Sequence, residues 1–271
     1  MAYQIEYAYT CHIGKVRGNN EDNFWCCGET LPADNQGTEK IHTGIISGDK
    51  NPVLAVFDGM GGESCGEMAA YLASEEFGRY YEENRRHLRK EPENFINDAC
   101  RSMNEAVCSY GREKRIRSMG TTVAMTLFAP DALYACNLGD SRIYLSGDGQ
   151  FRQISKDHVL GGNMLGKAPL TQYLGIPVEQ LMLEPSVAEI RYQEGNRILL
   201  CSDGMTDMLT DGEIADILTR ESSLRETVEI FLERVLKKGG RDNVTIILCE
   251  IQKQEYRERL KTWLKGINRS R

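Results

Sequence analysis

VLAVFDGMGG, residues 53–62, is a short apolar run that reaches Asp58 and then continues into glycines. Runs of this length that are rich in Val, Leu and Phe predict a buried strand. An ionised carboxylate at the end of a buried strand is costly unless it is paired, and a metal ion is a strong partner. The stretch therefore predicts a strand that carries a carboxylate to the edge of a sheet.

Three further apolar runs adjoin an aspartate in the same way. They contain Asp140 in YACNLGDSRIYL (134–145), Asp203 in RILLCSDGMTDM (197–208) and Asp242 in GGRDNVTIILC (239–249). If the sheet gathers the four aspartates at one edge, their oxygen atoms suit Mg²⁺ or Mn²⁺. Taken singly, each aspartate is better explained as a turn residue that hydrogen-bonds to the nearby backbone. The set of four predicts a metal-dependent catalyst rather than a scaffold.

The composition is that of an ordinary globular protein. The chain has 271 residues, of which 41% are hydrophobic and 27% charged, enough for one large domain or two small ones. No apolar stretch approaches the roughly 18 residues of a membrane span. The N-terminus lacks the basic start and apolar core of a signal peptide. We therefore expect no membrane span and a cytoplasmic location.

The net charge and the cysteine pattern argue against several functional classes. The formal net charge of −7 argues against general nucleic-acid binding, because such proteins usually carry a basic footprint. The nine cysteines are scattered, lack a C-x-x-C pair and lie mostly in apolar runs. This pattern favours reduced core thiols over a zinc site or a cysteine nucleophile.

Runs of antiparallel strands separated by pairs of helices predict an α+β sandwich in a single domain, residues 1–251. Helices are expected just after Gly62, at about 95–110, at 211–220 and at 223–237, and the Gly and Pro residues of 155–185 predict an irregular segment. Strands are expected at 3–12, 23–27, 42–47, 52–57, 121–128, 132–138, 141–147, 150–154, 186–192, 197–202 and 243–251.

The end of the chain has a different character. Residues 252–271 are basic, and they contain an apolar stripe with the i, i+3, i+4, i+7 spacing of a helix, formed by Leu260, Trp263, Leu264 and Ile267. We expect this amphipathic helix to pack on the domain. The alternative is that it forms a docking surface for a partner or an acidic membrane.

Seven motifs, in order along residues 8–250, resemble the metal-dependent protein phosphatases of type 2C. They are RGNNED (17–22), VFDGMGG (56–62), Gly120-Thr121-Thr122, NLGDSRIY (137–144), Lys156-Asp157-His158, LLCSDGMTD (199–207) and GGRDNVTI (239–246). One motif alone is a weak signal, but seven in sequence order are specific, and DGMGG resembles the bacterial branch. The resemblance implies a central antiparallel β-sandwich flanked by pairs of helices.

The resemblance also implies a centre that holds two Mg²⁺ or Mn²⁺ ions. Asp58 would bridge the two ions. The Gly59 carbonyl would approach the second ion closely, because glycine has no side chain. Asp203 and Asp242 would complete the shell of the first ion.

Four more residues complete the implied site. Asp22 and its neighbour Glu21 would support the second ion directly or through water. Asp140 would help to hold a third, weaker ion. The planar guanidinium of Arg17 would bind the substrate phosphate. The implied reaction is hydrolysis of phosphoserine and phosphothreonine in proteins, the products of a cellular Ser/Thr kinase, by a water that two metal ions activate.

Two features depart from the family pattern. Eukaryotic members carry a histidine, usually assigned as the general acid, where this chain has Met60, and a thioether cannot donate a proton. The leaving group would then take its proton from water or from another residue. The segment between His158 and Leu174 is also shorter than the flap that borders the active site in many bacterial relatives.

Several residues in the motifs are expected to have structural roles. Arg142 is interpreted as the partner of a nearby carboxylate, and Asp207 as a helix-end residue. His158 and the run Gly120-Thr121-Thr122 are also interpreted as structural.

Two other functions compete with this interpretation. A catalytically silent regulator that binds phosphoproteins predicts the loss of one or more metal carboxylates, whereas Asp22, Asp58, Asp203 and Asp242 are all present. A two-metal enzyme acting on nucleotides or other small phosphoesters is disfavoured by the absence of a G-x-x-x-x-G-K-[ST] pattern.

Overall fold

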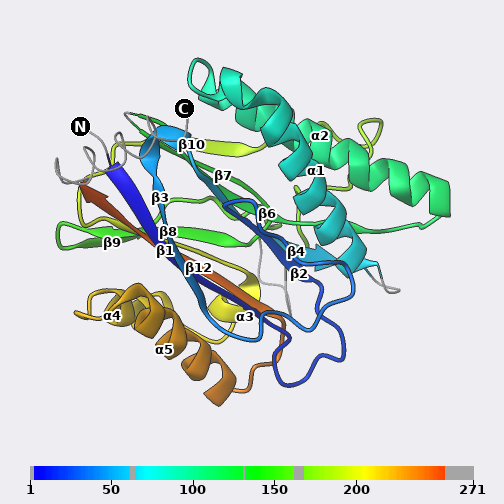
Figure 1. Cartoon of the computed structure of the whole chain (residues 1–271). Coiled ribbons are helices and arrows are strands. Elements are labelled where there is room, and N and C mark those ends of the chain that lie inside the picture. The colour runs from blue at the N-terminus through cyan, green and yellow to red at the C-terminus, as the bar shows by residue number, and fades with distance from the viewer. Residues whose placement is uncertain (1–2, 62–64, 131, 162–167, 254–271) are drawn as a thin grey trace, which may run out of the picture.

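Two antiparallel β-sheets lie face to face in the structure, a computed structural model that describes residues 3–61, 65–130, 132–161 and 168–253 (Figure 1). The first sheet has the strand order β3-β1-β12-β11-β8-β9, and the second has the order β10-β7-β6-β4-β2, with β5 paired to β4. The strands are β1 (Tyr3–His12), β2 (Asp22–Cys26), β3 (His42–Ser47), β4 (Val53–Met60), β5 (Gly120–Thr121), β6 (Val123–Phe128), β7 (Leu133–Leu138), β8 (Arg142–Gly147), β9 (Gln150–Gln153), β10 (Ser186–Ile190), β11 (Arg197–Cys201) and β12 (Val244–Lys253).

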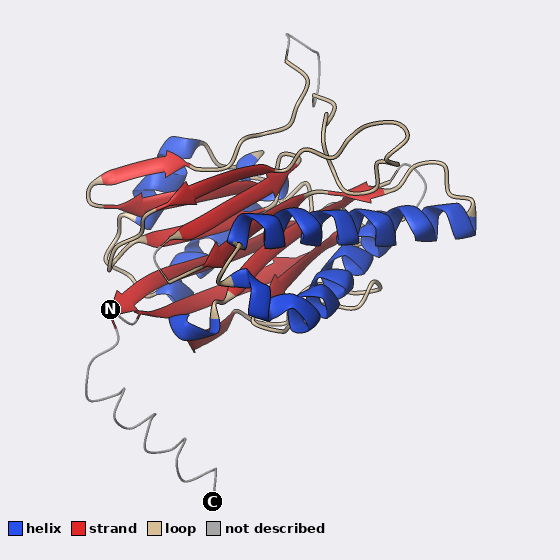
Figure 2. Ribbon diagram, turned by 90° about the horizontal axis from the view of Figure 1, so that it is seen from above, coloured by secondary structure: helices blue, strands red, loops and turns tan. Residues whose placement is uncertain are grey.

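Long helices cover the outer face of each sheet, as Figures 1 and 2 show. The second sheet packs against α1 (Gly66–Leu88) and α2 (Pro92–Lys114). The first sheet packs against α4 (Asp211–Leu218) and α5 (Leu224–Lys237). Of two short helical turns, η1 (Gly48–Lys50) lies between β3 and β4, and α3 (Asp203–Thr206) lies between β11 and α4. The predicted α+β sandwich with flanking helix pairs is confirmed.

Strand β4 is buried on both faces, which explains why its sequence is apolar without alternation. Leu54 and Val56 point into the core between the two sheets, whereas Val53, Ala55 and Phe57 point into the core beneath α1 and α2. Because both faces of the strand are covered, every position from 53 to 57 is buried. Burial of one large apolar side chain contributes about 1.5–3 kcal/mol, so this packing fixes the strand that leads to Asp58.

Local sequence sets where α4 and α5 begin. Thr210 and Glu213 form a capping box at the start of α4, and Ser223 and Glu226 form one at the start of α5. Such caps satisfy backbone N–H groups at the helix start and contribute about 1 kcal/mol each. In contrast, α1 begins after Cys65 without a side-chain cap, and its first turn packs against β4 instead.

The structure corrects several predicted boundaries. Strand β4 does not end before Asp58 but continues to Met60, because Gly59 and Met60 pair with Thr121 and Gly120 of β5. Helix α2 extends the predicted 95–110 in both directions. The predictions did not include η1 or α3.

The end of β12 bears on the predicted C-terminal helix. Gln252 and Lys253, placed at the start of that helix, instead pair with Gln4 and Tyr3 in the first sheet. The remainder of the predicted helix, residues 254–271, lies outside the described residues.

Two chain-wide predictions can be compared with the structure. Within the described ranges, no helix is long and apolar enough to cross a membrane. All nine cysteines are free thiols, and seven of them are buried, which confirms the prediction of reduced core thiols.

Candidate metal centre

Strands β2 and β4 place two of the predicted carboxylates side by side. In the antiparallel register Asp22 lies opposite Asp58, and Asp22 is only 2% exposed. Burial raises the pKa of Asp22 well above its usual range, and the charge of Asp58 raises it further. Ser202 and Thr245 oppose this shift by donating hydroxyl hydrogen bonds of 2.7 and 2.8 Å to Asp22 Oδ2. Asp22 is therefore a buried carboxylate that receives neutral donors beside a second carboxylate.

Thr122 holds the backbone of Asp58 in place. Its Oγ1 accepts a hydrogen bond of 3.1 Å from Asp58 N, and its backbone N donates one of 2.9 Å to Asp58 O. Thr122 Oγ1 also shares a hydrogen bond of 2.7 Å with Ser141 Oγ, next to Asp140. One threonine thus ties β4 to the turn between β7 and β8, which is the structural role expected for this motif.

Three predicted carboxylates line a single cavity of about 240 Å³. Asp58 comes from β4, Asp140 from the β7–β8 turn and Asp203 from the first residue of α3. The other described lining residues are Met60, Thr122, Ala168 and Leu170, so the cavity presents carboxylate and hydroxyl oxygens without a thiol or imidazole. Hard divalent cations prefer such oxygen ligands. The donor set therefore fits Mg²⁺ or Mn²⁺.

The carboxylates face this cavity without forming a closed cluster. Over the described ranges, no group of three or more Asp, Glu, His or Cys side chains is close enough together to hold a metal ion. Because like charges at one edge repel each other, drawing these side chains together requires a cation. The structure thus brings Asp58, Asp140 and Asp203 to one cavity but not to one point.

Two glycines allow the elements of the centre to approach one another. A Cβ atom at Gly59 would overlap the Gly66 carbonyl oxygen and would lie 2.5 Å from the Glu21 carbonyl oxygen. A Cβ atom at Gly204 would overlap the Asn243 carbonyl oxygen. These neighbours are backbone atoms that cannot rotate away, so both Asp-Gly pairs of the motifs need their glycine for packing.

Asp242 and Arg17 form an ion pair, although neither is among the described residues that line the cavity of Asp58, Asp140 and Asp203. Arg17 Nη2 donates to Asp242 Oδ2 at 2.7 Å, with the two side chains 50% and 29% exposed. The adjacent Asn243 accepts a hydrogen bond of 2.8 Å from Glu21 N and donates to two further carbonyl oxygens of the β1–β2 loop. Asn243 therefore holds the loop that carries Arg17 against the start of β12.

Glu21 lies between Arg17 and the first turn of α1. Burial raises the pKa of Glu21, and the charge of Glu67 raises it further, whereas Arg17 lowers it. The Glu21 carbonyl oxygen accepts a hydrogen bond of 3.0 Å from Gly59 N. The predicted neighbours Glu21 and Gly59 are thus brought into direct contact.

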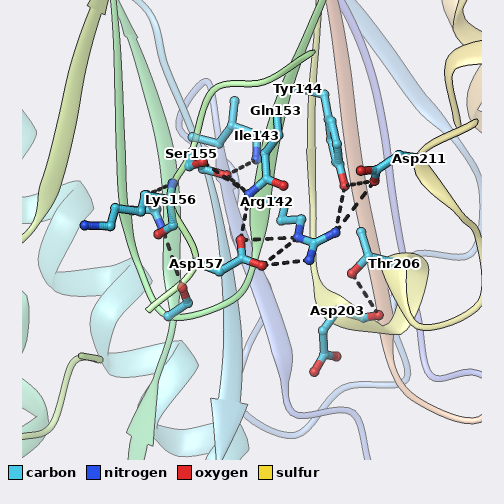
Figure 3. A network of polar contacts seen from close by, with 12 residues as sticks. Arg142, Ile143, Tyr144, Gln153, Ser155, Lys156, Asp157, Asp203, Thr206 and Asp211 are labelled. Carbon is cyan, nitrogen blue, oxygen red and sulfur yellow. Dashed lines mark hydrogen bonds and ion pairs between the residues drawn. The ribbon is translucent and has the colours of Figure 1, made fainter. Parts of the chain in front are cut away.

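Beside the centre lies a second polar group, the Arg142 network (Figure 3). Arg142 binds Asp157 through two nitrogens, with distances of 2.7 Å from Nη2 and 2.9 Å from Nε to Asp157 Oδ2. Gln153 Nε2 donates to Asp157 Oδ1 at 2.6 Å, and Tyr144 donates to Asp211 at 2.9 Å. The prediction that Arg142 is the partner of a nearby carboxylate is confirmed. Asp207, at the end of α3, is confirmed as a helix-end residue.

The two features that depart from the family pattern, Met60 and the segment after His158, both lie at the cavity. Met60 lines the cavity where a proton donor would be useful. His158 Nδ1 accepts a hydrogen bond of 3.3 Å from Gly139 N, and burial lowers the pKa of His158; its structural role stays a prediction. Ala168 and Leu170 belong to the predicted flap and line the cavity, whereas residues 162–167 of that segment lie outside the described residues.

The sequence predictions missed three polar residues that hold the centre together: Ser202, Thr245 and Asn243. Ser202 and Asn243 each adjoin a predicted metal ligand, and Thr245 interrupts an otherwise apolar strand. A buried polar side chain requires a hydrogen-bond partner, so these positions carried a signal. Their partners, Asp22 and Glu21, are distant in sequence and became evident only in the fold.

Comparison with known proteins agrees with this geometry. The family model described as Protein phosphatase 2C matches residues 40–265. The chain is 28% identical over 251 residues to the serine/threonine phosphatase stp of Listeria innocua, covering 88% of this chain and 92% of that one.

Two solved structures have the same fold. The Mycobacterium tuberculosis serine/threonine phosphatase PstP/Ppp matches with a TM-score of 0.73 and 26% identity, covering 92% of this chain and 100% of that one. The PstP catalytic domain in complex with two manganese ions matches with a TM-score of 0.71 and 26% identity, covering 93% and 100%. The chain therefore belongs to the protein phosphatase 2C family and is a protein phosphatase of the bacterial serine/threonine type found in these relatives.

Proposed function

We propose that the centre hydrolyses phosphoserine and phosphothreonine in proteins with the help of two Mg²⁺ or Mn²⁺ ions. The observation that carries this proposal is the cavity shared by Asp58, Asp140 and Asp203. The Arg17–Asp242 pair lies close enough for the charge of Asp58 to act on Arg17. The two manganese ions of the PstP catalytic domain support the choice of metal.

Four groups would hold the ions nearest the reaction. Asp58 would bridge them, because it lies between the neighbouring carboxylate of β2 and the shared cavity. Asp203 and Asp242 would hold the first ion, and the Gly59 carbonyl would face the second. When bound, two such ions lower the pKa of a shared water and supply a hydroxide nucleophile near neutral pH.

Three further carboxylates would support this arrangement. Asp22 lies behind Asp58, and its hydroxyl donors fix its orientation. Glu21 would support the second ion, directly or through water. Asp140 would help to hold a third, weaker ion, since it lines the cavity together with Asp203.

Arg17 would bind and orient the phosphoryl group. Its guanidinium donates to Asp242 through Nη2, and the planar fork offers further N–H groups to phosphate oxygens. The attacking water approaches phosphorus in line with the departing Ser or Thr oxygen, without a phosphoenzyme. Because Met60 cannot donate a proton, the leaving oxygen would take its proton from water or from another residue.

The proposed substrates are phosphoproteins made by a cellular Ser/Thr kinase. The net charge of −7 gives no general attraction to phosphoproteins, so Arg17 and the ions must provide the local positive potential. A cytoplasmic location agrees with nine free cysteines. The basic segment 254–271, which lies outside the described residues, would pack on the domain, or would dock on a partner or an acidic membrane.

The proposal is tested with metal-stripped protein and a phosphothreonine peptide. Turnover should appear only when Mn²⁺ or Mg²⁺ is restored, and Asp58→Asn should lower it by about 10³-fold or more. Asp207→Asn is the matched control and should retain turnover. Asp207 is close to Asp203 in sequence, but it is exposed and ends helix α3.

Two outcomes would favour the competing functions. A folded protein that binds metal and phosphopeptide without turnover would indicate a silent regulator. Faster turnover of nucleotides than of the phosphopeptide would indicate an enzyme for small phosphoesters.

A further inference from the structure

Glu67, in the first turn of α1, carries a buried oxygen without a hydrogen-bond partner. Its Oε2 is inaccessible to solvent and receives no hydrogen bond in the described structure. A buried carboxylate oxygen without a donor is destabilising, because it loses its hydration without compensation. Neither the seven family motifs nor the cavity lining accounts for Glu67.

Glu67 lies next to two groups that are proposed to serve the second ion, the Glu21 carboxylate and the Gly59 carbonyl. A Cβ atom on the preceding Gly66 would lie 2.9 Å from Glu21 Oε1 and 3.0 Å from the Gly59 carbonyl carbon. The Glu21 carboxylate and the Gly59 carbonyl group therefore both lie against the start of α1. Glu67 directly follows Gly66, so its backbone lies beside the Glu21 carboxylate, and the charge of Glu67 raises the pKa of Glu21.

The protein itself offers this pair little compensation. Arg17 acts on Glu21 but is paired with Asp242. The positive end of the α1 dipole favours negative charge at this position, but it does not supply the hydrogen-bond donor that Glu67 Oε2 lacks. A cation with its water shell supplies both positive charge and donors.

We propose that Glu67 acts together with Glu21 toward the cation on the Gly59 side of the centre, with Glu67 Oε2 accepting a hydrogen bond from a water of that cation's shell. This inference rests on the proposed two-metal function. It makes Glu67 a positioning residue for one of the two ions, whereas Asp203 and Asp242 serve the other ion.

The test is calorimetric titration of metal-stripped protein with Mn²⁺ alone. In the wild type we expect two classes of tight site. Glu67→Gln should weaken one class by about 10-fold or more and leave the other unchanged. Glu67→Asp, which keeps the charge on a shorter side chain, should have an intermediate affinity. Glu75→Gln, an exposed glutamate on the same helix, is the matched control and should bind Mn²⁺ as the wild type does.

Thermal melting of the metal-free variants separates a metal role from a purely structural one. Metal-free Glu67→Gln should be at least as stable as the wild type, because the substitution removes repulsion from Glu21. Unchanged Mn²⁺ affinity at both sites in Glu67→Gln would overturn the inference while leaving the proposed function intact. Absence of tight Mn²⁺ binding in the wild type would instead overturn the proposed function itself.

Discussion

The metal centre and the Arg142 network lie next to each other, yet Asp22 of the centre and Asp157 of the network have opposite environments. In the network, Asp157 receives a two-nitrogen contact from Arg142 and a further bond from Gln153. Burial lowers the pKa of Arg142, but the hydrogen bonds and charges of Asp157 and Tyr144 together outweigh that effect and raise the pKa. In the centre, Asp22 receives only neutral hydroxyl donors and its pKa is raised.

The difference in hydrogen-bond donors distinguishes Asp157, a structural carboxylate, from Asp22, a carboxylate whose charge the protein does not balance. A buried carboxylate that has an arginine is electrically complete, and removing it leaves an unbalanced charge. Other buried carboxylates accept hydrogen bonds from neutral donors only and lie next to a second carboxylate. Their negative charge can be balanced by a bound cation. The two regions should therefore respond oppositely to substitution.

Of the substitutions that compare the two regions, Gly59→Ala has the largest expected effect. The new methyl group would overlap the Gly66 carbonyl oxygen, which forces β4 away from α1. Turnover should fall by about 10²-fold, since a misplacement of about 1 Å has that effect, and stability should fall by about 1–3 kcal/mol. Peptide turnover and urea unfolding measure the two effects.

Gly212→Ala provides the matched control on the network side. Gly212 lies in α4 next to Asp211, with nothing within 4 Å of its Cβ position. Alanine should stabilise the helix there by about 0.5–1 kcal/mol without changing turnover. Equal losses in both variants would show that close approach at Gly59 is not special.

The second prediction concerns stability in the Arg142 network. Asp157→Asn should destabilise the protein by about 2 kcal/mol, because it removes the nearer of the two carboxylates that pair with Arg142 and leaves only Asp211, at 3.7 Å. Its affinity for Mn²⁺ should match that of the wild type. Urea unfolding and calorimetric titration check this pair of results. Loss of Mn²⁺ binding would place Asp157 in the metal centre and break the distinction.

At the two contrasted carboxylates, the smaller expected change in stability is the one at Asp22, and it is in the opposite direction. Asp22→Asn should stabilise the metal-free protein by about 1 kcal/mol at neutral pH, because it removes a buried charge beside Asp58 while keeping the shape of the side chain. Its Mn²⁺ affinity should fall. Thermal melting with and without Mn²⁺ measures both. A metal-free variant less stable than the wild type would show that Asp22 is structural, like Asp157.

Much of the fold was predictable because both faces of the strands are covered. The apolar stretch 53–57 could be recognised as a strand from composition alone, and the helices α4 and α5 carry capping boxes that mark their starts. The continuation of β4 through Asp58 was not predictable, because it depends on pairing with β5, which lies 60 to 62 residues away in sequence: Gly59 pairs with Thr121 and Met60 with Gly120.

The candidate site shows the same division. The motifs indicated Asp58, Asp140 and Asp203, and the fold brings them to one cavity. The hydroxyl donors of Asp22 come from Ser202 and Thr245, on segments that meet β2 only after the two sheets pack. No local pattern around residue 22 could have predicted them.

The sequence by itself determined the strand pattern, the flanking helices and the identity of most carboxylates, because periodicity, turn chemistry and motif order are local properties of the chain. The tertiary structure alone decided which carboxylates pair with an arginine and which accept hydrogen bonds from neutral donors only. It also left one oxygen of Glu67 without a hydrogen-bond donor. The physical reason is that charge balance depends on distances between segments that are far apart in the chain. Those distances are set when the two sheets and α1 pack together.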